Sequence, residues 1–222
     1  MIIIFRLIVT ILFSFLEYAA NKPFAFDVVF AVGGFGPDAE GLFRMQKIFV
    51  NTFLDSFQYP IENGFIQFGL MQYGRNARVV KNLDQNYVIT YIRKYLNDMR
   101  VDRTGAAIGK VFDSAADSVF SRGRRDVPRF LVVFTDATGY HSRSLLRYAK
   151  QKLLDKNVRI IMVGAGNKIR LADMVTMAGR PSDVIRTHSS KTFMQTYYPV
   201  VQRILNCKFY ARFLNISIKH QV

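Results

Sequence analysis

The sequence contains no tryptophan, a single cysteine and only three glutamates. One cysteine, Cys207, cannot support a scaffold of internal disulfides or a cysteine-rich metal cluster. The 16 acidic residues are outnumbered by 31 lysines and arginines, which gives a formal net charge of +15. A field of this sign favours polyanionic partners such as acidic glycans, anionic lipids or nucleic acid. The other interpretation is that the charge only keeps the chain in solution.

The sequence also lacks the residue patterns of a catalytic site. Its three histidines, His141, His188 and His220, are scattered along the chain. They form no His-x-x-x-His pair, and no nucleophile elbow or Ser-His-acid order accompanies them. We therefore expect neither hydrolase nor transferase activity, and we predict that the chain is not an enzyme.

The first 25 residues have the pattern of a targeting segment. Arg6 precedes an apolar run over residues 7–16, and two small alanines follow. This run has the length of a signal-peptide core and is short for a membrane span. We predict a signal peptide over residues 1–25 and secretion to the extracellular space. The alternative is an uncleaved segment that anchors the chain, and only in that case do we expect contact with a membrane.

Residues 26–222 contain no repeat or linker, and we predict one domain there. The sequon at Asn215 is a candidate glycosylation site and fits secretion. In a secreted chain, the leftover Cys207 suggests either an intermolecular disulfide, and hence self-association, or a buried free thiol.

Buried strands alternate with amphipathic helices along this domain. Continuous apolar runs predict strands at residues 27–32, 130–135 and 158–163, with a hairpin at 65–73 and 77–80 and a short strand at 184–186. Apolar residues at helical spacing predict helices at 38–57, 87–99, 105–120, 144–156, 172–178 and 191–206. The alternation predicts an α/β fold with a doubly wound, mostly parallel six-stranded sheet, one antiparallel edge strand and helices on both faces.

The glycine-rich loop after the first strand has two interpretations. Gly34-x-Gly36-x-x-Ala39 matches the dinucleotide-binding fingerprint of a Rossmann-type enzyme. However, Asp55, the acid at the required spacing, falls on the first helix, and the next strands suggest a hairpin instead of a β-α-β unit. Pro37 also removes one backbone amide from the phosphate cradle. A nucleotide-binding enzyme stays as the alternative that a copurifying cofactor would support.

The second interpretation covers nearly the whole mature chain. It rests on DVVFAV at 27–32, GLMQY at 69–73, TGAAI at 104–108, FLVVFTD at 130–136 and IIMVG at 160–164. Together with the order of elements, these segments resemble the von Willebrand factor type A domain of integrins, collagens and matrix proteins. The resemblance implies a non-enzymatic module that binds an extracellular protein or a glycosaminoglycan.

In that family, a metal-ion-dependent adhesion site (MIDAS) holds a divalent cation with an Asp-x-Ser-x-Ser loop, a Thr and an Asp. The resemblance places residues without a side-chain oxygen at the three loop positions: Gly33, Phe35 and Pro37. Asp102 stands at the Thr position with Thr104 two residues on, and Asp136 is retained. Because hard cations need several converging oxygens, we expect no cofactor. The alternative is a Mg²⁺ or Mn²⁺ site on Asp102, Thr104 and Asp136. We expect Asp38 to be the N-cap of the first helix instead of a ligand.

Two surfaces are candidates for partner contact. One is the carboxyl edge of the sheet, where we expect Phe35, Tyr140 and His141. An equal interpretation is that Phe35 and Tyr140 pack inward, and His141 in a polar loop is also typical of an ordinary surface residue. The other is basic and comprises a loop and one helix face: Arg122, Arg124, Arg125, Arg129, Arg143, Arg147 and Lys150. These cations suit the sulfates and carboxylates of glycosaminoglycans, although a solvated helix face is an equal interpretation. We expect no nucleic acid partner, because such a partner conflicts with secretion.

Overall fold

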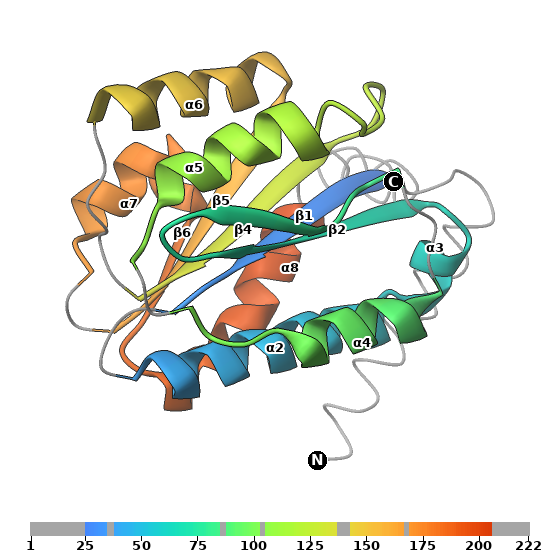
Figure 1. The fold of residues 1–222 in the computed structure, drawn as a ribbon, viewed down its shortest axis with the longest axis horizontal. Helices are drawn as coiled ribbons and strands as arrows, with labels where there is room; N and C mark the ends of the chain where they lie inside the picture. Colours follow the sequence, from blue (N-terminus) through green and yellow to red (C-terminus); the bar gives the residue numbers. More distant parts are fainter. Residues whose placement is uncertain are drawn as a thin grey trace, which may run out of the picture.

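The computed structural model describes residues 25–34, 38–84, 88–102, 105–136, 143–166 and 169–205. Its centre is a six-stranded sheet of order β3-β2-β1-β4-β5-β6 (Figure 1). The strands are β1 (Phe26–Val32), β2 (Ile66–Tyr73), β3 (Ala77–Lys81), β4 (Arg129–Thr135), β5 (Val158–Ala165) and β6 (Val184–Thr187). All neighbouring strands are parallel except β2 and β3. The predicted fold class is therefore confirmed.

Helices cover both faces of this sheet (Figure 1). One face carries α2 (Ala39–Ser56), α4 (Ile89–Asp98) and α8 (Tyr197–Leu205), with the short α3 (Gln58–Glu62) at its margin. The other carries α5 (Ile108–Ser114), α6 (Arg143–Asp155) and α7 (Leu171–Ala178). Three irregular turns complete the described chain: the π-helical η1 (Ala115–Val119) and the 3-10 helices η2 (Pro181–Asp183) and η3 (Ser190–Thr196). None of the described helices combines the length and hydropathy that a membrane span requires.

The central strands β1, β4 and β5 are mostly apolar because both of their faces are covered. In β1, Val28 and Phe30 belong to the core under α2, α4 and α8, whereas Val29 and Ala31 belong to the core under α5, α6 and α7. This alternation is the two-residue period of a strand. Phe30 lies at the centre of an aromatic cluster formed with Phe49, Phe53, Phe68 and Phe134.

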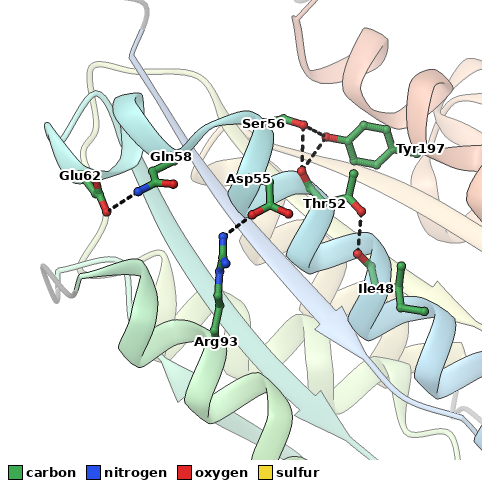
Figure 2. Close-up of polar contacts among 8 residues, drawn as sticks. All are labelled: Ile48, Thr52, Asp55, Ser56, Gln58, Glu62, Arg93 and Tyr197. Atoms are coloured by element: carbon green, nitrogen blue, oxygen red, sulfur yellow. Dashed lines mark hydrogen bonds and ion pairs between the residues drawn. The ribbon is translucent and has the colours of Figure 1, made fainter. Parts of the chain in front are cut away.

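Polar contacts hold α2 between its two neighbours (Figure 2). On one side, Arg93 of α4 forms an ion pair with Asp55. On the other, the Tyr197 hydroxyl at the start of α8 donates to Ser56 Oγ at 2.7 Å. Asp55 lies in the last turn of α2. At a rise of 1.5 Å per residue, it is about 24 Å along the helix axis from the glycine loop.

β2 runs parallel to β1, whereas the sequence favours a hairpin in place of a β-α-β unit. β1, α2 and β2 do form a parallel β-α-β unit, and the hairpin follows as β2 and β3. A hairpin fixes the direction of β3 relative to β2 only. It does not determine whether β2 runs parallel or antiparallel to β1. β2 nevertheless ends at Tyr73 without an acidic residue. Neither it nor Asp55 supplies the ribose-binding carboxylate that the dinucleotide interpretation requires.

Candidate functional site

Gly33, the residue after β1, is held from two sides. The side chain of the buried Gln46 in α2 accepts a hydrogen bond from the backbone nitrogen of Gly33 at 2.9 Å. The same side chain donates a hydrogen bond to the carbonyl oxygen of Gly33 at 2.7 Å. A Cβ atom at position 33 would lie 2.7 Å from Cε1 of Tyr73 and 2.8 Å from the Tyr73 carbonyl oxygen. The first loop position of the family's metal site therefore has no room for a ligand side chain.

Tyr73 is the residue that closes this position. Its ring is buried, and its hydroxyl donates to the carbonyl oxygen of Phe134 in β4. Because β1 lies between β2 and β4, the side chain reaches across the end of β1. Burial, and then the charge of Asp136, raise the pKa of Tyr73 far above its usual value, while a hydrogen bond with Thr135 opposes the shift. The phenol is therefore neutral and acts as a fixed structural bridge.

The two candidate carboxylates lie at the ends of different strands. Asp136 follows β4 and is 9% exposed, and its charge contributes to the raised pKa of Tyr73. Asp102 lies against Gly74 after β2, where an added Cβ would overlap its carboxylate. Gly33 follows the strand between them. Five expected site residues lie outside the described part of the chain: Phe35, Pro37, Thr104, Tyr140 and His141.

The described residues do not fit the family's metal. They contain no group of three or more His, Cys, Asp and Glu side chains that could hold an ion. The position that would supply the first carboxylate is filled by Tyr73. Since a hard cation requires several oxygens at short distance, Asp102 and Asp136 alone make an incomplete ligand set.

A hollow of about 410 Å³ adjoins Asp102 at the same edge of the sheet. Its charged lining has both signs: Arg78, Asp98, Arg100 and Asp102. Arg78 also donates to Gln72 Oε1 at 3.1 Å, which fixes part of this lining. The hollow suits a partner that presents charges of both signs.

Asp38 occupies the expected N-cap position of α2, but its carboxylate forms no capping hydrogen bond. Instead it accepts a hydrogen bond from the hydroxyl of Ser190 in η3. Asp38 therefore ties the start of α2 to a segment 152 residues further along the chain.

Two of the basic candidates lie within the fold. Arg124 donates through Nε and its backbone nitrogen to the fully buried Asp27, at 2.9 and 2.8 Å. Burial raises the pKa of Asp27, and the bonds from Arg124 oppose that shift. Arg129 is 5% exposed and donates to the carbonyl oxygens of Arg124 and Lys156. Both arginines hold together the amino-terminal ends of the strands.

The remaining basic candidates are dispersed. Arg122 pairs with Asp84 at 3.2 Å, and Arg125 is exposed. On α6, Arg147 is exposed, whereas Lys150 donates to the carbonyl oxygen of Thr176 in α7 at 2.7 Å. Arg143 begins α6, and its side chain is outside the described part. The basic loop precedes β4, so it lies at the opposite end of the sheet from Gly33. Cys207 and Asn215 are also outside the described residues.

In a comparison against protein families, the model of the von Willebrand factor type A domain matches residues 27–199. The chain belongs to this family. Matrilin-1 of Gallus gallus is 28% identical over 148 residues, which are 65% of this chain and 29% of that protein. The von Willebrand factor type A domain described here thus spans less than a third of that relative.

Solved structures share the fold at low sequence identity. Proximal thread matrix protein 1 from the mussel byssus superimposes with a TM-score of 0.72 at 19% identity, over 80% of this chain and 47% of that chain. A structure of the same protein with a zinc-occupied MIDAS motif gives a TM-score of 0.70 at 22% identity, with the same coverage. A von Willebrand factor type A structure from Catenulispora acidiphila gives 0.60 at 14% identity, over 79% and 42%. Metal binding therefore occurs in a protein of the same fold.

Proposed function

We propose that this chain is a non-enzymatic adhesion module of the extracellular matrix that binds its partner without the family's metal ion. The observation that carries the proposal is the Tyr73 ring, which occupies the space of a ligand side chain at Gly33. The similarity to matrilin-1 and to a byssal matrix protein supports a place in the matrix. Secretion after removal of residues 1–25 and self-association through Cys207 belong to the same proposal.

The partner is an extracellular protein or an acidic glycan. In a metal-holding domain, an open coordination position accepts a carboxylate from the partner. Here Arg78 and Arg100 line the hollow beside Asp102, and guanidinium groups bind carboxylates by paired hydrogen bonds. Phe35 and Tyr140 are the proposed apolar contacts at this edge, and His141 is a further proposed contact residue.

The test is a calorimetric titration of the purified chain with Mg²⁺ and Mn²⁺, beside an Asp136→Ala variant. We expect no saturable binding, and we expect adhesion to immobilised matrix proteins to be equal in EDTA and in Mg²⁺. Saturable metal binding that Asp136→Ala abolishes, with adhesion lost in EDTA, would establish metal-dependent adhesion through Asp102 and Asp136 and refute the proposal.

A further inference from the structure

A second hollow, of about 560 Å³, lies at the end of the sheet opposite Gly33. It is bounded by the loop before β4 and by the carboxyl-terminal end of α6, which lie close together in Figure 1. Its lining includes four cationic side chains, Arg125, Arg129, Lys152 and Lys156, against two acidic ones, Asp117 and Asp155. The excess of positive charge makes it a candidate site for an anion.

Arg129 provides a buried and fixed guanidinium in this hollow. Its Nε and Nη1 donate to the carbonyl oxygens of Arg124 and Lys156, the latter at 3.0 Å. Among the described residues, none accepts a hydrogen bond from its Nη2. Because the two carbonyls fix the plane of the group, Nη2 is the part of Arg129 that remains for a ligand.

Arg125 brings a second guanidinium to the lining of the same hollow. Burial lowers the pKa of Arg129, Asp27 opposes this, and the charge of Arg125 lowers it further. Asp126 acts on Arg129 in the opposite direction. Arg125 itself forms no hydrogen bond or ion pair with the described chain. Two like charges held together repel each other, and an anion between them would relieve that repulsion.

The other charges do not cancel this pair. Lys152 is bound to Asp113 at 2.8 Å and to Asp117 at 2.7 Å, so Asp117 is already neutralised. Asp155 accepts a hydrogen bond from Gln151 at 2.8 Å and is exposed. The ammonium group of Lys156 has no hydrogen-bond or ion-pair partner among the described residues. Three cationic groups from separate elements are therefore available to one ligand.

Asn157 adds an amide beside them. It joins α6 to β5 with a φ of 56°, and it is the one described non-glycine residue with a positive φ. Asparagine tolerates this conformation better than most residues, and its side chain lines the hollow. Glycine would keep the backbone and remove only the amide, which provides a substitution with little risk to folding.

We propose that this hollow binds a sulfate group of a sulfated glycan through Arg125, Arg129 and Lys156. The inference rests on the proposed matrix function and names its acidic-glycan partner and the place where it binds. Donors that come from different elements can surround a tetrahedral oxyanion, and arginine binds such groups in a bidentate manner. The hollow also has the volume of a ligand pocket, so a sugar ring fits beside the sulfate.

The experiment measures the affinity of the full chain for a heparin oligosaccharide of defined length, near physiological salt. The hollow variant is Arg125→Gln with Lys156→Gln. The matched control, Arg44→Gln with Lys94→Gln, removes the same charge from exposed positions on α2 and α4. We expect the hollow variant to bind about tenfold more weakly or worse, since charge-assisted hydrogen bonds are lost, and the control to change less than about twofold. Asn157→Gly should fold normally and weaken binding by about threefold.

Two further probes decide the ligand. Inorganic sulfate alone should compete with the oligosaccharide only weakly, and polyglutamate should not compete. Equal loss in the control variant would show that the whole charge of the chain attracts the glycan, and would overturn the site. Equal competition by polyglutamate would indicate an acidic protein partner and overturn the glycan assignment. If heparin fails to bind while adhesion in EDTA persists, this inference alone is lost; loss of both removes the proposed function as well.

Discussion

Substitution of Gly33 is the sharpest test of how the carboxyl edge is built. In a Gly33→Ala variant, the new Cβ would lie within 2.8 Å of both the ring and the carbonyl oxygen of Tyr73. Both contacts are shorter than packed atoms tolerate, and Gln46 prevents the loop from moving away. Overpacking of this kind costs about 1–3 kcal/mol, so we expect the free energy of unfolding to fall by about 2 kcal/mol.

A double-mutant cycle separates the ring from the backbone. Tyr73→Ala alone should cost about 3–5 kcal/mol, because it leaves a cavity in a packed core. In the double variant, the ring contact is absent, and we expect a cost about 1–2 kcal/mol smaller than the sum of the two single costs. Urea denaturation followed by circular dichroism measures all four proteins. Additivity within about 0.5 kcal/mol would refute the conclusion that the Tyr73 ring closes the position.

Three further predictions concern stability. Arg124→Ala leaves the fully buried Asp27 without its ion-pair partner, and we expect it to lower the free energy of unfolding by about 3–5 kcal/mol; a loss below about 1 kcal/mol in urea would contradict the assigned role. Burial lowers the pKa of Lys81 from 10.5 to about 8. Between these two pH values the unfolded chain binds more protons than the folded chain, so the free energy of unfolding should rise with pH, by about 1.5 kcal/mol from pH 8 to 9.5. Lys81→Met should flatten this rise in urea titrations, whereas an unchanged slope would exclude Lys81 as its source. Tyr197→Phe removes the hydrogen bond to Ser56 and should cost about 1 kcal/mol in the same assay, and no loss would show that solvent replaces the bond.

The strands could be predicted because apolar runs are continuous, and the run at residues 27–32 is followed directly by two glycines. The end of the helix predicted at 105–120 could not be predicted from the sequence. Ala115, Ala116 and Val119 keep the apolar spacing of an α-helix, while the backbone changes to a π-helical turn. Periodicity reports which face is buried, and it is insensitive to this change in hydrogen bonding.

The closure of Gly33 was invisible in the sequence for a different reason. The composition of the loop shows that side-chain oxygens are missing from it, but the role of Tyr73 depends on strand register. Val32 pairs with Gln72, which brings the following residues, Gly33 and Tyr73, side by side. Parallel strands far apart in sequence carry no local signal for such a register.

Arg124 and Arg129 illustrate the converse error, because dense positive charge predicts an exposed surface whereas both side chains are bound within the fold. The useful signal was Asp27, an acid at the start of a central strand that is buried on both faces. A buried carboxylate requires a cationic partner, and the nearest dense source of cations in the fold is the loop before β4, the strand next to β1. Arg124 meets that requirement by binding Asp27 inside the fold, and Arg129 in turn donates a hydrogen bond to the carbonyl oxygen of Arg124. Arg125 and Lys156 are left at the rim without a partner among the described residues, so the need to neutralise Asp27 is also what assembles the cationic hollow around them.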